Sequence, residues 1–152
     1  MTSIPEGAAP GAQRCSVLGA LTVLGDFWAL GIIRCALFEM TRFSEFQEEL
    51  GASTNVLSDR LARLVEAGVL AREAYQDRPL RHRYVLTEAG QELAPVIYSL
   101  KRWGDRHVQV DGPWTEVRHL GCSVPAEIGT FCPACDARLG AADIETVWVR
   151  EP

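Results

Sequence analysis

Residues 42–68 read RFSEFQEELGASTNVLSDRLARLVEAG and decide the fold, because they contain two short helical segments joined by a tight turn. In the first segment, Ser44 and Gln47 have the spacing of an S-x-x-Q capping box, which predicts a helix capped by Ser44. Gly51 follows and ends that helix, since glycine readily adopts the left-handed backbone of a helix C-terminus.

The second segment is predicted to begin at about Thr54 and to end at Gly68. It carries three leucines at positions i, i+4 and i+7, which form one apolar stripe along a helix. These residues are Leu57, Leu61 and Leu64. Two short helices joined in this way form a helix-turn-helix.

A two-stranded hairpin is predicted directly after the second helix. Residues 69–75 have strand composition, residues 76–79 (QDRP) are typical of a turn, and residues 81–86 alternate basic and apolar side chains. A helix-turn-helix followed by such a hairpin is the arrangement called a winged helix.

Three further helices are expected around this motif. Residues 16–24 form an apolar helix, and residues 27–38 are apolar nearly all round, which is typical of a buried helix with Cys35 in the core. Residues 87–107 form a long helix that begins at a threonine cap, and Pro95 is expected to kink it because its ring removes a backbone hydrogen bond.

Ordered matches along residues 15–106 give this segment a resemblance to the HxlR-type winged-helix transcriptional regulators of bacteria. One of the matches is a cysteine, Cys15, just ahead of the first helix. The other motifs are Leu24-Gly25-Asp26-Phe27-Trp28, Arg42-Phe43-Ser44-Glu45-Phe46, Val56-Leu57-Ser58-Asp59-Arg60-Leu61, Gly68-Val69-Leu70, Tyr84-Val85-Leu86-Thr87-Glu88-Ala89-Gly90, Leu93-Ala94-Pro95-Val96 and Trp103. The resemblance implies a DNA-binding homodimer without enzymatic activity.

The expected fold class is mainly α (α+β), a winged helix-turn-helix with flanking dimerisation helices and a small zinc-ribbon-like β segment at the C-terminus. Residues 1–13 are expected to be a disordered leader, because they hold almost no large apolar side chain. Residues 14–110 form the DNA-binding and dimerisation domain, and residues 111–152 form a cysteine-containing extension. No run of about 18 uncharged apolar residues and no signal peptide is visible, which predicts a cytoplasmic protein.

The recognition helix, about residues 54–67, is expected to lie in the major groove of DNA. A helical wheel places Asn55, Asp59, Ala62 and Glu66 opposite the leucine stripe. Asn55 suits a bidentate pair with adenine, and Ser58 suits a phosphate or a base edge. The alternative is an ordinary solvated face on which serine or threonine only caps the helix. The predicted contacts in and before this helix are Arg42, Ser44, Thr54, Asn55, Ser58, Asp59, Arg60 and Arg63.

Arg60 lies at the border of the apolar stripe on the wheel. A structural ion pair with an acid such as Glu88 is therefore an equal alternative to a phosphate contact for this side chain.

The net charge of −5 does not exclude DNA, because a duplex responds to local charge. Residues 42–106 hold ten Lys and Arg against ten acids, and residues 72–86 hold four Arg against two acids. The wing, about residues 76–83, is therefore expected to contact phosphates and the minor groove. Its predicted contacts are Arg78, Arg81, His82 and Arg83.

The helices that flank the winged motif offer more apolar surface than one small domain needs. We therefore expect a two-fold homodimer, formed through the first and last helices, that binds an inverted repeat in double-stranded DNA.

The extension carries Cys132-Pro133-Ala134-Cys135, a tight turn that can direct two thiolates at one ion. Zinc takes four ligands, and His119 and Cys122 lie upstream with two residues between them. A structural zinc ion bound by His119, Cys122, Cys132 and Cys135 would supply folding energy to a segment with little core. A redox C-x-x-C pair and free thiols are the alternatives, although no βαβ frame for a thioredoxin-like site is visible.

The resemblance also implies an effector. Some members of the family use a cysteine at the start of the first helix to sense oxidants or electrophiles, and Cys15 occupies that position. The alternative is a small side chain at the dimer interface. A thiol-redox module or a protein-interaction module that uses the cysteine-rich tail remains the other functional reading. No phosphate loop, paired carboxylates or Ser/His/Asp set supports an enzyme.

Overall fold

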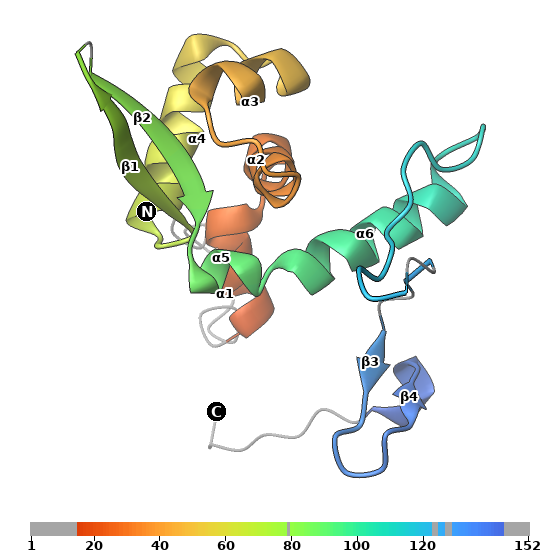
Figure 1. Cartoon of the computed structure of the whole chain (residues 1–152). Helices are drawn as coiled ribbons and strands as arrows, with labels where there is room; N and C mark the ends of the chain where they lie inside the picture. The colour runs from red at the N-terminus through yellow and green to blue at the C-terminus, as the bar shows by residue number, and fades with distance from the viewer. Residues whose placement is uncertain (1–14, 79, 123–124, 127–128, 145–152) are drawn as a thin grey trace, which may run out of the picture. The chain divides into compact units, whose positions relative to one another are not determined.

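The computed structural model describes residues 15–78, 80–122, 125–126 and 129–144 (Figure 1). The chain forms two compact units, Met1–Ala94 and Pro95–Pro152, which are described separately. The sequence predicts that the long helix over residues 87–107 belongs to the winged domain. The division after Ala94 instead places most of that segment in the second unit, with the tail. The predicted leader, residues 1–13, and the strand-like end at residues 145–150 lie outside the described residues.

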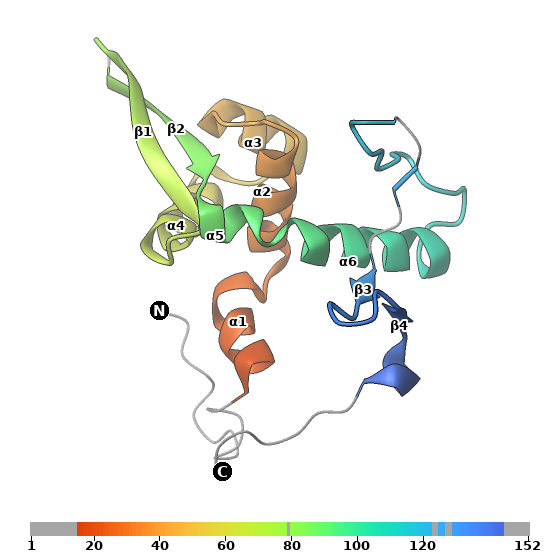
Figure 2. The ribbon, with the colours of Figure 1, turned by 60° about the horizontal axis from the view of Figure 1, so that its bottom comes forward.

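The first unit is a winged helix-turn-helix. Its helices are α1 (Ser16–Leu24), α2 (Phe27–Leu37), α3 (Phe43–Leu50), α4 (Thr54–Glu66) and α5 (Glu88–Gln91), and its wing consists of β1 (Leu70–Asp77) and β2 (Leu80–Leu86). The two strands are antiparallel, in a register that runs from Leu70 opposite Leu86 to Asp77 opposite Leu80. A bulge between Ala74 and Gln76 interrupts the ladder. Figure 2 shows the wing projecting from the helices.

The core of this unit lies where α2 packs against α3 and α4. The leucine stripe of α4 is fully buried there, as predicted. Phe46, Ile32 and Ile33 meet it from α3 and α2, and Cys35 is buried among them. The expected core role of Cys35 is therefore confirmed, and burial raises the pKa of its thiol.

The start of α3 corrects one prediction. The helix begins at Phe43, and it is Glu45 that closes its N-terminus, because one carboxylate oxygen accepts the N–H groups of Thr41 and Arg42, each at 2.8 Å. These two bonds lower the pKa of the Glu45 carboxyl. The predicted box of Ser44 and Gln47 is wrong because Ser44 already lies inside the first turn.

The prediction of one continuous helix over residues 87–107 is also wrong, because the structure has two helices there. Thr87 caps a helix as predicted, since its hydroxyl accepts the N–H of Gly90, but that helix ends at Gln91. A separate helix, α6, runs over Ala94–His107. Pro95 therefore lies in the first turn of α6, where its missing N–H has no intrahelical partner to lose, and it causes no kink inside a helix.

The wing differs from the prediction mainly at its turn, and β1 begins one residue later than predicted, at Leu70. Gln76 and Asp77 belong to β1, and Leu80 already belongs to β2, so the strands are longer and the turn is shorter than residues 76–79 indicate.

The second unit contains α6, the two-residue strands β3 (Thr130–Phe131) and β4 (Arg138–Leu139), and a short 3-10 helix, η2 (Ala141–Asp143). Strands β3 and β4 pair antiparallel.

No single described helix is long and apolar enough to span a membrane. Helices α1 and α2 together reach that length and composition, but they meet at 81°.

Candidate nucleic-acid interface

The turn between α3 and α4 is locked by side-chain hydrogen bonds. Gly51 has a positive φ of 64°, the left-handed conformation that ends α3. Ser53 caps α4 by accepting the N–H of Val56 at 3.4 Å. From α3, the side-chain amide of Gln47 donates to Thr54 Oγ1 at 3.2 Å and to the Ala52 carbonyl at 3.5 Å. This turn sets the direction in which α4 leaves α3.

The N-terminal half of α4 presents a polar face to solvent. Thr54, Asn55, Ser58 and Asp59 are all exposed, while the leucines behind them are buried. Asn55 and Ser58 have no hydrogen-bond partner for their side chains among the described residues. This arrangement leaves an amide and a hydroxyl free at the end of the helix that is predicted to meet base edges.

Two arginines of α4 face the protein instead. Arg60 Nε lies 3.0 Å from Asp26 Oδ2, both side chains are mostly buried, and Arg60 also pairs with Asp59. Arg63 donates to the carbonyl oxygen of Thr22 in α1 at 3.5 Å. The structural ion pair considered for Arg60 is thus confirmed, with Asp26 and not Glu88 as the acid.

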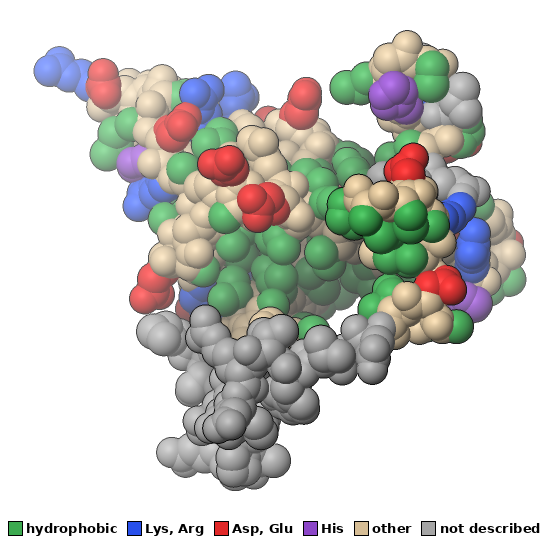
Figure 3. Space-filling view, turned by 90° about the horizontal axis from the view of Figure 1, so that it is seen from below, with side chains coloured by type: hydrophobic (Ala, Val, Ile, Leu, Met, Phe, Trp, Pro, Cys, Tyr) green, Lys and Arg blue, Asp and Glu red, His purple; other side chains and the backbone are tan. Residues whose placement is uncertain are grey.

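The basic side chains of the wing fall into two groups. Arg83 pairs with Glu73 across the sheet at 2.9 Å, and His82 Nδ1 lies 3.0 Å from an Arg72 guanidinium nitrogen. Arg78 and Arg81 are exposed at the tip, and neither guanidinium has a partner within the described ranges. Figure 3 shows several Lys and Arg side chains toward the wing end of the first unit, with Asp and Glu side chains among them.

Arg42 connects the start of α3 with the wing. Its backbone forms a bridge with Arg83, next to a hydrogen bond from Tyr84 N to the Thr41 carbonyl at 2.7 Å. The Arg42 guanidinium lies over the Tyr75 ring, 5.6 Å from its centroid. Arg42 therefore remains exposed beside the wing. Ser44 is also exposed, and its side chain has no hydrogen-bond partner among the described residues.

The sequence did not predict the roles of Asp26, Gln47 and Tyr75. Asp26 directly precedes α2 and is a residue type favoured at helix N-caps, so its capping role had a local signal. Its contact with α4, like the two other contacts, depends on how the helices pack, which no local pattern specifies.

Apolar side chains remain exposed on α1 and on α6. On α1, Val17 and Leu21 are 68% and 50% exposed. On α6, Val96, Leu100 and Trp103 are each at least half exposed, while Ile97 is buried. Each helix thus carries an apolar stripe larger than its own unit covers.

The histidine and the three cysteines predicted to bind zinc lie in two separate pairs, His119 with Cys122 and Cys132 with Cys135. His119 Nδ1 lies 3.2 Å from Cys122 Sγ. Cys132 accepts hydrogen bonds from the N–H groups of Ala134 and Cys135 and from the Cys135 thiol, and these bonds lower its pKa. Within the described ranges, no three His, Cys, Asp or Glu side chains lie close enough to share a metal ion. The predicted four-ligand zinc site therefore stays a prediction.

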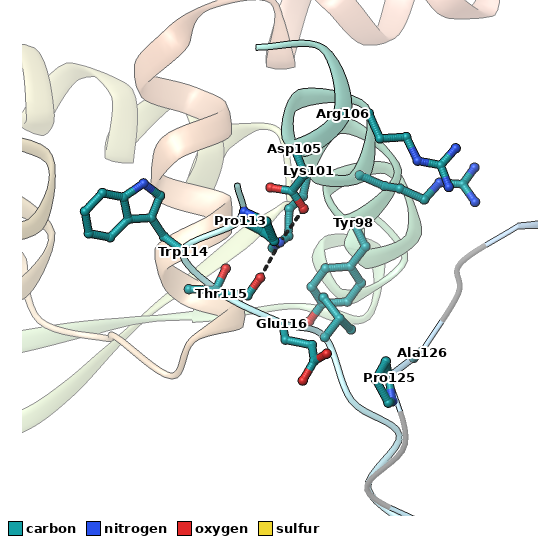
Figure 4. Close-up of a pocket in the computed structure, with 12 residues that line it drawn as sticks. Tyr98, Lys101, Asp105, Arg106, Pro113, Trp114, Thr115, Glu116, Pro125 and Ala126 are labelled. Atoms are coloured by element: carbon teal, nitrogen blue, oxygen red, sulfur yellow. Dashed lines mark hydrogen bonds and ion pairs between the residues drawn. The ribbon is translucent and has the colours of Figure 1, made fainter. Parts of the chain in front are cut away.

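A pocket of about 470 Å³ lies between α6 and residues 113–117 and 125–126 of the second unit (Figure 4). Lys101 fixes one wall, because its ammonium donates to Asp105 Oδ2 and to the Thr115 carbonyl, each at 2.6 Å. Tyr98, Arg106 and other side chains of both signs line the remainder. Its size is that of a small-molecule site.

A helix-turn-helix with an exposed polar helix face and a partly unpaired basic wing defines a DNA-binding transcriptional regulator. The HxlR-like helix-turn-helix family model matches residues 23–111, and the chain belongs to this family.

Named relatives agree with this assignment. The chain is 38% identical over 130 residues to the uncharacterized HTH-type transcriptional regulator Rv3095 of Mycobacterium tuberculosis, a match that covers 85% of this chain and 82% of that protein. The crystal structure of PA1607, a proposed transcription factor, superposes with a TM-score of 0.75 at 28% identity, covering 93% of this chain and 96% of PA1607. The oxidized form of the redox regulator HypR gives a TM-score of 0.59 at 30% identity, with 63% of this chain and all of HypR covered. These relatives are named as regulators and not as enzymes, and the chain is an HTH-type transcriptional regulator.

Proposed function

We propose that this regulator acts in the cytoplasm as a homodimer that binds an inverted repeat in double-stranded DNA. The N-terminal half of α4 enters the major groove, and the wing contacts the adjacent backbone and minor groove. The observation that carries this proposal is the free amide and hydroxyl of Asn55 and Ser58, held outward by the locked α3–α4 turn. Thr54 and Asp59 flank these two side chains on the same face.

Binding contacts divide by chemistry. Asn55 and Ser58 read base edges, because amide and hydroxyl groups match the donors and acceptors of the major groove. Arg42, Arg78 and Arg81 neutralise phosphates, which adds affinity without sequence preference. Arg83 and His82 serve the wing mainly through their cross-strand partners, and Arg60 and Arg63 serve the packing of α4.

This division gives the first prediction. Replacing Asn55 with Ala lowers affinity for the operator about tenfold and leaves binding to unrelated DNA unchanged, since a bidentate base contact is worth about 1–3 kcal/mol. The double variant Arg78→Ala/Arg81→Ala weakens binding to both DNAs and reduces the slope of log K against log salt by about two, because two phosphate contacts are lost.

Fluorescence anisotropy measures both effects over a salt series, with DNA from upstream of the protein's own gene as operator and a shuffled duplex as competitor. Glu66→Ala is the matched control, because Glu66 is exposed at the far end of the same helix. Equal losses of operator and shuffled binding in Asn55→Ala, or an unchanged salt slope in the wing variant, would contradict the assigned roles.

Dimerisation is proposed through the exposed apolar faces of α1 and α6. In a monomer the large apolar side chains of these two faces would remain exposed to water. In the proposed dimer a second copy of the chain covers them at a two-fold axis. The two recognition helices then reach two half-sites separated by about one helical turn of DNA.

The second prediction tests this interface. Val17→Glu/Leu21→Glu shifts the chain to a monomer, because two charges cannot be buried in an apolar contact without partners. Light scattering at micromolar concentration measures the mass, and operator affinity falls at least tenfold with it. Val110→Glu is the control, since Val110 is 95% exposed but lies outside both helices. A wild-type mass equal to one chain contradicts the proposal directly.

An effector is the remaining part of the proposed function. Cys15 is half-buried at the N-cap of α1, and its side chain makes no capping bond. Its place beside the proposed dimer interface favours a redox signal that alters the dimer. The pocket on the second unit is the place that suits a small-molecule signal.

A further inference from the structure

The tail holds folded turns that hydrophobic burial does not explain. None of the described residues after His107 is buried, and the large side chains Trp114 and Leu120 are 85% and 100% exposed. A segment of this size without a core needs another source of stability. A metal ion, disulfides or a partner chain can supply it, and the side chains at the turns indicate which.

Each of two successive turns carries a pair of soft ligands. The first turn is closed by a bridge between Arg118 and Pro125 and by a hydrogen bond from Ala126 N to the Val117 carbonyl at 2.8 Å. It brings His119 and Cys122 together, with 3.2 Å between Nδ1 and Sγ. Strands β3 and β4 close the second turn, which carries Cys132 and Cys135.

The second turn has the backbone of a metal knuckle. Cys132 N donates to the Ala137 carbonyl at 2.9 Å, and Asp136 N donates to the Cys132 carbonyl at 2.8 Å. The N–H groups of Ala134 and Cys135 both donate hydrogen bonds to the Cys132 sulfur. Asp136 stands where such knuckles often have glycine, and it adopts the left-handed conformation with a φ of 57°. Aspartate tolerates this conformation better than most residues do.

We propose that the two turns close around one Zn²⁺ ion, bound by His119, Cys122, Cys132 and Cys135. Three thiolates and one imidazole form a tetrahedral structural site, which zinc prefers. On binding, each thiol that is still protonated releases its proton to solvent, and the histidine binds as neutral imidazole.

Closing the site requires the two turns to approach each other, because no three donors share one position in the described ranges. Nine residues separate Cys122 from Cys132. They span up to about 30 Å when extended, so the connection does not prevent the approach. The free chain thus provides two preformed halves of a zinc ribbon, and the ion joins them.

The test uses the full chain, purified under reducing conditions and analysed for metal by mass spectrometry. One equivalent of zinc per chain is expected, and Co²⁺ exchanged into the site gives the intense thiolate-to-metal absorption of a sulfur-rich tetrahedral centre. Cys132→Ser and Cys135→Ser lose the metal, and His119→Ala retains it with at least tenfold weaker affinity. Cys15→Ser is the matched control and keeps one equivalent.

Two results would overturn the proposal. One is less than about half an equivalent of metal in the wild-type chain, since structural zinc sites bind tightly. The other is a Cys132–Cys135 disulfide that forms under mild oxidant even when the chain is supplied with one equivalent of zinc, which identifies a dithiol pair that the metal does not protect. Limited proteolysis of the wild-type chain, with and without a chelator, does not depend on whether the variants fold. Removal of the metal is expected to accelerate cleavage after residue 107. Operator binding by the metal-free chain is measured separately. If the metal-free chain still binds the operator, a failure of the zinc proposal leaves the proposed DNA-binding function intact.

Discussion

Gly90→Ala is expected to destabilise the first unit by about 3 kcal/mol, near the upper end of the usual cost of overpacking a tight site. A Cβ atom at this position would lie 2.2 Å from the Val69 carbonyl oxygen and 2.9 Å from Leu86 Cδ2. The carbonyl oxygen has little freedom to move, because it accepts the N–H of Thr87 at 3.1 Å and its hydroxyl at 3.2 Å. The methyl group therefore pushes α5 away from the base of the wing.

Urea unfolding followed by circular dichroism measures this loss as a lower midpoint with an unchanged slope. Gly19→Ala is the control, since nothing lies within 4 Å of a Cβ there and Gly19 sits inside α1. It gains up to about 1 kcal/mol from better helix propensity. Equal stability of Gly90→Ala and the wild-type protein would show that α5 does not dock as closely as this contact requires.

Asp26→Ala is expected to cost about 2 kcal/mol, because one carboxylate performs two tasks. One of its oxygens caps α2 by accepting the N–H groups of Trp28 and Ala29, each at 3.0 Å. The other lies 3.0 Å from Arg60 Nε and ties the start of α2 to α4. Losing the carboxylate removes the cap and leaves the mostly buried guanidinium with Asp59 alone.

Asp26→Asn separates the two tasks, since asparagine caps helices as well as aspartate but carries no charge. It is expected to lose about half as much stability as Asp26→Ala. A double-mutant cycle with Arg60→Ala measures the coupling, which should exceed 0.5 kcal/mol for residues in direct contact. If Arg60 instead served DNA, Arg60→Ala would reduce the salt slope of binding and the cycle would show no coupling.

Local sequence signals specified the parts of the fold that depend on neighbouring residues. The leucine spacing of α4, the glycines at positions 51 and 68 and the threonine cap at position 87 all act within one or two turns of chain. Their consequences in the structure agree with the prediction. Boundaries were less well specified. Ser44 and Glu45 both offer an oxygen near the start of α3, and the backbone bridge between Arg42 and Arg83 favours a start at Phe43.

The candidate site divides in the same way. Its polar helix face follows from the amphipathic period alone, so Asn55 and Ser58 could be identified from the sequence. The sequence could not identify which basic side chains stay available for phosphates, because the residues next to an arginine in the sequence do not indicate which acid or carbonyl it will pair with. Arg83 forms its ion pair with Glu73, and Arg63 donates to the Thr22 carbonyl, only once the strands and helices have packed.

The sequence by itself determined the winged helix-turn-helix, because hydrophobic period, capping residues and turn residues act over short distances along the chain. The tertiary structure alone decided that Arg60 belongs to Asp26, that α5 and α6 are separate helices and that the tail cysteines occupy two distinct turns. Those outcomes depend on which distant groups come within a few ångströms of each other. That is a property of packing, and residue order constrains it only through the whole fold.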